Sequence, residues 1–102
     1  MYNLIFNPSA ALGRSRKQLE IITKILDEKK VAYAVHTTEK PGHATQIAKA
    51  LIEKGSKILV AIGGDGTVTE VARSIYGTDA ALGIIPAGTG NDYRRVVGIP
   101  DE

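Results

Sequence analysis

The chain has 102 residues, 43% of them hydrophobic and 24% charged, which fits one small globular domain with a single core. Its formal charge of +2 is too small to indicate a nucleic-acid binder, and its 5% aromatic content offers few surfaces for stacking bases. The lack of Cys excludes disulfides and thiolate chemistry and fits a reducing cytoplasm, and no apolar run approaches the roughly 20 residues that a membrane span needs.

The chain opens with a predicted strand and a predicted helix. Residues 2–6 are a short apolar run that ends at the polar segment from Asn7 to Ser9, which indicates a buried strand and a turn. Residues 14–30 follow as a helix, and Ser15 with Gln18 three positions later fits a capping box at its start. The apolar positions at helical spacing are Leu19, Ile22, Ile25 and Leu26.

The same alternation continues through the middle of the chain. Residues 31–35 predict a second strand, and residues 42–54 predict a helix that ends before Gly55, which suits the position after a C-cap. One face of this helix is apolar, at Ala44, Ile47, Ala48, Leu51 and Ile52.

The second half of the chain carries two glycine-rich loops, each of which follows a predicted strand. The predicted order is a strand at 57–62, a glycine turn at 63–66, a helix at 67–76, a strand at 80–85, a loop at 86–90 and a short helix at 91–97. Strands that alternate with helices predict a three-layer α/β/α fold with a mostly parallel sheet of about four strands.

In a parallel sheet, the loops that follow the strands all emerge at the carboxyl edge. Loops rich in Gly, Thr, Asn and Asp gather at this edge, whereas the opposite edge has ordinary turns, and the asymmetry predicts a ligand site. The turn at 63–67 offers backbone N–H groups with no Cβ to block them, at the positive end of the next helix, which suits a phosphate. The alternative is a plain tight turn in which Asp65 or Thr67 caps the helix.

Asp65 needs a partner if a phosphate binds beside it. Two unit charges about 4 Å apart repel by roughly 4 kcal/mol at an effective dielectric constant of about 20. The carboxylate therefore indicates a bridging cation, for which Mg²⁺ is the usual companion of nucleotide phosphates, or a proton acceptor for an attacking hydroxyl. Asp92 is either part of the same polar network or a first-turn acid of the last helix.

Other common sites are excluded by their spacing. There is no G-x-x-x-x-G-K-[ST] motif, and neither Gly64 to Gly66 nor Gly88 to Gly90 leads to the third glycine of a dinucleotide fingerprint, which excludes a Rossmann dehydrogenase. His36 and His43 have no accompanying ligand set, so we predict no metal site of their own. The basic residues at 14–17 are interpreted as a solvated start of a helix.

At this point the sequence resembles the diacylglycerol kinase-like lipid kinases, the family of catalytic domains that also includes sphingosine kinases. The segments that carry the resemblance, in chain order, are Asn7-Pro8, Gly42-His43-Ala44, Gly63-Gly64-Asp65-Gly66-Thr67 followed by Glu70, the stretch from Leu82 to Tyr93, and Gly98-Ile99-Pro100. The resemblance covers nearly the whole chain, and the ordered set of motifs is highly specific.

The resemblance implies an ATP-binding lobe of an enzyme that transfers the γ-phosphoryl group of ATP, with Mg²⁺, to a lipid hydroxyl such as that of diacylglycerol. It implies that Asp65 is the catalytic residue, acting through the metal or as a base. The residues that it places near the nucleotide are Asn7, Pro8, Ser9, Ala10, Ala11, Thr38, Gly63, Gly64, Gly66, Thr67, Val68, Thr69, Glu70, Gly88, Thr89, Gly90, Asn91 and Asp92. The sequence departs from the family at Ala11, where Gly is frequent, and at Thr69, where Asn is common.

Such kinases are longer and have a β-rich second lobe that binds the lipid. We therefore expect residues 1–102 to be a single nucleotide-binding lobe, a fragment of a two-lobed kinase that is inactive by itself, in the cytoplasm, with peripheral membrane contact and self-association left open. One alternative is an NAD kinase-like lobe, which shares the Gly-Gly-Asp-Gly turn but not the continuation at 86–92. The other is a non-catalytic nucleotide-binding module that self-associates.

Overall fold

The computed structural model describes residues 1–9 and 14–84. The predicted loop at 86–90 and the predicted helix at 91–97 lie outside the described residues. In chain order the elements are β1 (Tyr2–Phe6), α1 (Arg14–Glu28), β2 (Tyr33–Thr37), α2 (His43–Glu53), β3 (Ile58–Ile62), α3 (Asp65–Ile75) and β4 (Ala81–Ile84). Within these ranges, no helix is long and apolar enough to cross a membrane.

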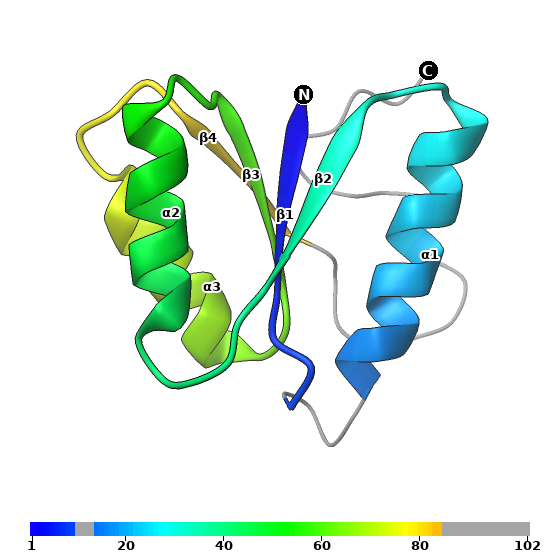
Figure 1. Cartoon of the computed structure of the whole chain (residues 1–102), viewed down its shortest axis with the longest axis horizontal. Helices are drawn as coiled ribbons and strands as arrows, with labels where there is room; N and C mark the ends of the chain where they lie inside the picture. Colours follow the sequence, from blue (N-terminus) through cyan, green and yellow to red (C-terminus); the bar gives the residue numbers. More distant parts are fainter. Residues whose placement is uncertain (10–13, 85–102) are drawn as a thin grey trace.

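The four strands form one parallel sheet in the order β2-β1-β3-β4. Helix α1 lies on one face of the sheet, and α2 and α3 lie side by side on the other (Figure 1). These three layers confirm the predicted α/β/α fold. β1 and β3 are neighbours, but the helices that follow them lie on opposite faces, so their carboxyl ends mark a topological switch point, where open α/β sheets bind ligands.

The core lies on both faces of β1, all of whose residues are buried. Leu4 and Phe6 point towards α1 and pack in a cluster with Ile22 and Leu26. Ile5 points to the opposite face and packs in a second cluster below α2 and α3. A strand covered on both sides is apolar at most positions, which explains the apolar runs in the sequence, and the amide of Asn3, the polar residue of β1, donates to the hydroxyl of Ser56 (2.7 Å).

The predicted capping box at the start of α1 is wrong. Ser15 lies inside the helix, fully buried, and its hydroxyl donates to the carbonyl of Asn7 (Oγ···O 2.7 Å). Gln18 is also buried, and its Oε1 has no hydrogen-bond partner among the described residues. Ser15 therefore ties α1 to the turn after β1 instead of capping the helix.

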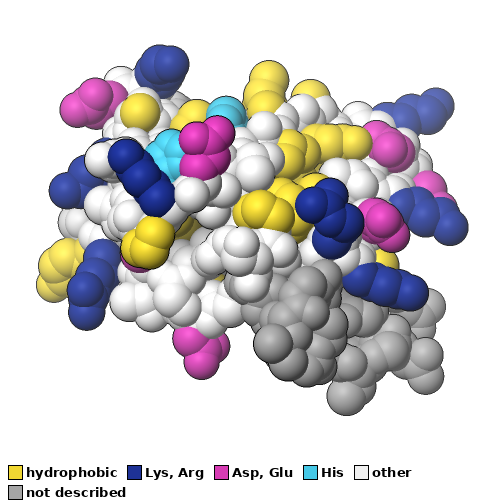
Figure 2. All heavy atoms as spheres, turned by 60° about the horizontal axis from the view of Figure 1, so that its bottom comes forward, with side chains coloured by type: hydrophobic (Ala, Val, Ile, Leu, Met, Phe, Trp, Pro, Cys, Tyr) yellow, Lys and Arg dark blue, Asp and Glu magenta, His cyan; other side chains and the backbone are white. Residues whose placement is uncertain are grey.

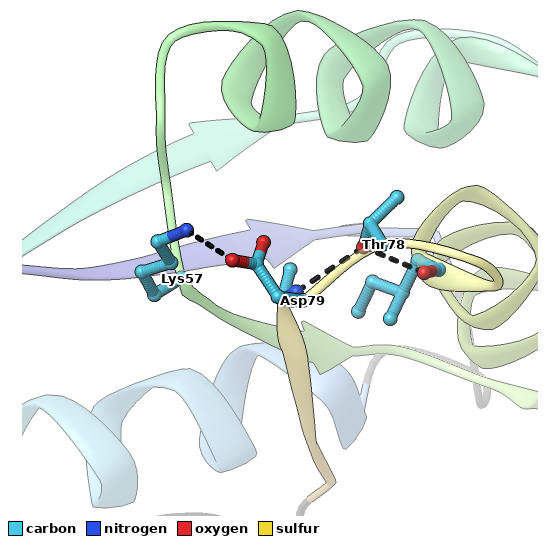
Figure 3. Close-up of polar contacts among 5 residues, drawn as sticks. Lys57, Thr78 and Asp79 are labelled. Carbon is cyan, nitrogen blue, oxygen red and sulfur yellow. Dashed lines mark hydrogen bonds and ion pairs between the residues drawn. The ribbon is translucent and has the colours of Figure 1, made fainter.

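Short turns hold the opposite, amino edge of the sheet. Lys57 and Asp79 form an exposed ion pair (Nζ···Oδ2 2.7 Å) that joins the turn before β3 to the turn before β4 (Figure 3). The hydrogen bond from Lys57 lowers the pKa of Asp79. Thr78 closes the second turn by donating to the carbonyl of Ile75 (2.6 Å) and accepting from the N–H of Ala80 (3.2 Å). These are ordinary turn contacts, as the sequence predicted for this edge.

Candidate functional site

A cavity of about 330 Å³ opens at the carboxyl edge of the sheet. Its walls come from the turn after β1, the β2–α2 loop and the first turns of α2 and α3. The lining residues are Asn7, Ser9, Thr38, Glu39, Lys40, Pro41, Ala44, Gly66, Thr67 and Glu70. Figure 2 turns this edge towards the viewer, and most of the Lys and Arg side chains in that view lie towards its margins. The fold therefore brings the loops that follow three strands to one site.

Close packing between two turns builds the switch point beside this cavity. The N–H of Asn7 donates to the carbonyl of Ile62 (2.9 Å), and the Oδ1 of Asn7 accepts from the N–H of Ser9 (3.0 Å). A Cβ on Gly63 would lie 2.7 Å from the Oγ1 of Thr67 and 3.2 Å from the Cβ of Asn7. Real Cβ atoms essentially never come within 3.0 Å of such an atom, so Thr67 or the turn itself would have to shift to admit any residue other than glycine at position 63.

The start of α3 faces the same edge. The helix begins at Asp65, two residues before its predicted start, and its N-cap is Gly64, which makes no side-chain cap hydrogen bond. Neither Asp65 nor Thr67 is therefore the N-cap, so this part of the plain-turn alternative is wrong. The first helical hydrogen bond runs from the N–H of Val68 to the carbonyl of Gly64 (3.2 Å). The preceding N–H groups, at 65–67, have no acceptor within the helix and lie at its positive end.

The close packing that surrounds the missing Cβ of Gly63 has no counterpart at Gly66. It lies in the first turn of α3 and lines the cavity, and apart from its chain neighbours and the adjacent backbone of α3, no described atom stands within 4 Å of where its Cβ would be. A glycine inside a helix costs up to about 1 kcal/mol relative to alanine. The space beside the backbone of Gly66 is open and can admit a ligand.

Carboxylates outnumber cations along the described wall of the cavity. Glu39 and Glu70 line it, and Lys40 is the one cation among its lining residues. Asp65 lies exposed at the first position of α3 nearby. An anionic ligand at this wall therefore needs backbone N–H groups, together with a cation that offsets the carboxylates.

The structure brings part of the predicted nucleotide site to the cavity wall. The predicted residues that line the cavity are Asn7, Ser9, Thr38, Gly66, Thr67 and Glu70. Pro8, Gly63 and Gly64 lie in the adjoining turns, Val68 packs against the core, and Thr69 is exposed on α3. Outside the described residues lie Ala10, Ala11, Gly88, Thr89, Gly90, Asn91 and Asp92.

The predicted site omitted some lining residues, namely Glu39, Lys40, Pro41 and Ala44. All of them follow Thr38 within one loop and the first turn of α2. Thr38 is buried, and its N–H continues the ladder of β1 and β2 by donating to the carbonyl of Phe6 (2.8 Å). A prediction that extended from Thr38 to the next helix would have included them, because a loop at the carboxyl edge lines that edge along its whole length.

The two histidines have separate structural roles. The Nε2 of His36 lies 3.0 Å from the Oδ1 of Asn3, and burial, followed by the charge of Lys54, lowers the pKa of His36. The Nδ1 of His43 accepts from the N–H of Glu39 (2.9 Å) in the loop beside the cavity. Among the described residues, no group of three or more His, Asp or Glu could hold a metal ion.

Together, the sheet order and the edge cavity define a doubly wound parallel α/β domain with a cavity at its switch point. All 102 residues match the family model of the diacylglycerol kinase catalytic domain. The chain belongs to this family, as the resemblance predicted, and is a lipid kinase-like domain.

Named relatives agree with this membership. The chain is 34% identical to the diacylglycerol kinase of Bacillus subtilis, over 97% of this chain and 33% of that protein. It is 34% identical to a "Probable lipid kinase YegS-like" of Klebsiella pneumoniae, over 88% of this chain and 31% of that protein. A crystal structure of a "putative diacylglycerol kinase" from Bacillus anthracis has a TM-score of 0.70 at 30% identity and covers 97% of this chain and 34% of that one. The chain thus spans about a third of the length of these relatives.

Proposed function

We propose that this chain is the ATP-binding lobe of a lipid kinase that transfers the γ-phosphoryl group of ATP to a lipid hydroxyl, such as that of diacylglycerol. Membership of the family and the names of the relatives support the kinase class. The observation that carries the nucleotide site is the open space beside Gly66 in the cavity wall. That space adjoins the N–H groups at the start of α3, which is the arrangement that binds phosphate.

The first turn of α3 holds the phosphates in this proposal. The N–H groups of residues 65–67 donate to phosphate oxygens, and Gly66 lets them approach because it has no Cβ. Asp65 either accepts the proton of the lipid hydroxyl or holds Mg²⁺, which offsets the charge of the phosphates when bound. The lipid oxygen forms its bond to the γ-phosphorus as the bond to the β,γ-bridging oxygen breaks, and ADP leaves. The proton of the lipid hydroxyl passes to Asp65, or to water where Asp65 holds Mg²⁺ instead.

The chain by itself is expected to bind ATP but to transfer little or no phosphate. Positioning supplies most of the catalysis in phosphoryl transfer. The chain covers only 33% of the Bacillus subtilis relative, and we propose that the lipid site belongs to the remainder of such a protein. Phosphorylation of diacylglycerol by the isolated chain, abolished in Asp65→Asn, would show that this expectation is wrong.

Gly66→Ala tests the phosphate site. Calorimetric titration with ATP and Mg²⁺ should show binding to the wild-type chain and an affinity about tenfold or more lower for the variant, because the added methyl group occupies the space of the phosphate. Urea unfolding should show equal or greater stability, by up to about 1 kcal/mol, because alanine favours the helix. A loss of affinity without a loss of stability is the result that identifies a ligand site.

The control for this experiment is Arg73→Ala, an exposed substitution in the last turn of the same helix, which should leave the affinity for ATP unchanged. Equal affinities of the wild-type chain and Gly66→Ala would contradict the proposal. Titration with NAD in place of ATP distinguishes the NAD kinase-like alternative. Light scattering identifies the other alternative, a self-associating module that binds no nucleotide.

A further inference from the structure

The N-terminus of α2 has no side-chain cap from its N-cap residue, although the N–H of His43 donates to the carbonyl of Lys40 (3.1 Å). The N-cap residue is Gly42, which adopts the left-handed conformation (φ 84) and makes no side-chain cap hydrogen bond. The loop before it, residues 39–41, forms part of the cavity wall. The first N–H groups of a helix need acceptors from elsewhere, and the way in which α2 obtains them decides how firmly this wall is held.

Glu70 of α3 supplies the acceptors for two further N–H groups. Its Oε2 accepts from the N–H of Gly42 (3.3 Å), and its Oε1 accepts from the N–H of Thr45 (3.0 Å) and from the hydroxyl of Thr45 (3.1 Å). Glu70 is only partly exposed, and a carboxylate at a helix N-terminus also interacts favourably with the helix dipole. Both oxygens of this side chain are therefore engaged with α2.

The two helices on this face consequently present different ends to the cavity. Both helices have a glycine N-cap, but the start of α2 is closed by the carboxylate of Glu70, whereas no described side chain accepts from the N–H groups at 65–67. The loop between β2 and α2 is further braced by His43, whose Nδ1 accepts from the N–H of Glu39 (2.9 Å). The loop, α2 and α3 are thus joined by hydrogen bonds around one side of the cavity.

We infer that Glu70 is a positioning residue, whose carboxylate fixes the N-terminus of α2 to α3 and so sets the width of the cavity that it lines. The three hydrogen bonds, all from neutral groups of α2 and its N-cap, hold both carboxylate oxygens in place. The inference rests on the proposed function as far as the nucleotide is concerned. The link between α2 and α3 depends on no ligand.

Amide hydrogen exchange in the chain without nucleotide tests the link. Glu70→Ala removes both acceptor oxygens, so the N–H groups of Gly42 and Thr45 should exchange about tenfold or more faster. Glu70→Gln keeps one acceptor oxygen and should protect one of the two, and it covers the case in which Glu70→Ala does not fold. The control is Gln46→Ala, an exposed substitution on α2. Unchanged exchange at both groups in Glu70→Ala and Glu70→Gln would overturn the inference.

Affinity for ATP tests what the link does for the cavity. Glu70→Ala should weaken binding several-fold, and Glu70→Gln should recover most of the loss. Thr45→Val, which removes only the hydroxyl donor, should add no further loss in the Glu70→Ala background, because both changes break the same link. Additive losses, or a loss of affinity in Glu70→Ala without faster exchange, would instead indicate that Glu70 contacts the nucleotide. A wild-type chain that binds no ATP would contradict the proposed function, while the exchange measurement would still decide for or against the link.

Discussion

Gly63 and Gly66 belong to one sequence motif, yet the protein needs them for different reasons. The sequence predicts a single role for both, because it shows only that neither has a Cβ near a possible phosphate. The structure separates them: the missing Cβ of Gly63 makes room for Thr67 and Asn7, and that of Gly66 makes room for no described atom. The same substitution should therefore have opposite effects on stability at these two positions.

Gly63→Ala should destabilise the fold by roughly 1–3 kcal/mol, because the new methyl group overlaps a packed threonine. Urea unfolding monitored by circular dichroism measures the effect. Thr67→Ala in the same background should recover part of the loss, since the Oγ1 of Thr67 is the nearest atom at 2.7 Å. A Gly63→Ala chain as stable as the wild type would mean that the turn relaxes freely and that packing does not require the glycine.

The end of α1 shows why the bounds of an element are harder to predict than its existence. An apolar run at 31–35 predicted the second strand, but β2 spans Tyr33–Thr37. Lys30 adopts the left-handed conformation (φ 59), and the N–H of Val31 donates to the carbonyl of Leu26 (2.9 Å). This is the long hydrogen bond of a Schellman motif, with Val31 as its apolar contact. Val31 is apolar because it packs against the core at the end of the helix. Hydrophobicity alone does not distinguish such a residue from the first residue of a strand.

Lys30→Gly should therefore stabilise the chain, by up to about 1 kcal/mol, because glycine adopts the left-handed conformation without strain. The matched control is Lys24→Gly, at an exposed position inside α1, which should destabilise by about 1 kcal/mol. Chemical denaturation of the two variants beside the wild type measures both effects. Destabilisation by Lys30→Gly of the same size as in the control would show that the helix end tolerates lysine as well as glycine.

The architecture of the whole molecule is predictable in one respect and not in another. Strands that alternate with helices predict a parallel sheet. The parallel arrangement is sufficient to bring the loops after the strands to one edge, where the cavity lies. The order β2-β1-β3-β4 does not follow from apolar runs, because they do not say which strands are neighbours. The engagement of Glu70 was equally hidden, since it depends on α2 and α3 lying side by side and joins residues 25 positions apart.

Because the cavity exists only when these loops and helices are assembled, ATP should bind the folded chain and not the unfolded one. At a free ATP concentration of about 100 times Kd, binding adds roughly 2.7 kcal/mol to the stability, which for a domain of this size raises Tm by roughly 10–20 °C. Differential scanning calorimetry over a series of ATP concentrations with Mg²⁺ measures the rise. Adenosine, which lacks phosphates, should give a much smaller shift, and Gly66→Ala should lose most of the ATP shift although its own Tm without ligand is no lower. Equal shifts with adenosine and ATP would place the binding energy on the nucleoside and remove the case for a phosphate site at the start of α3.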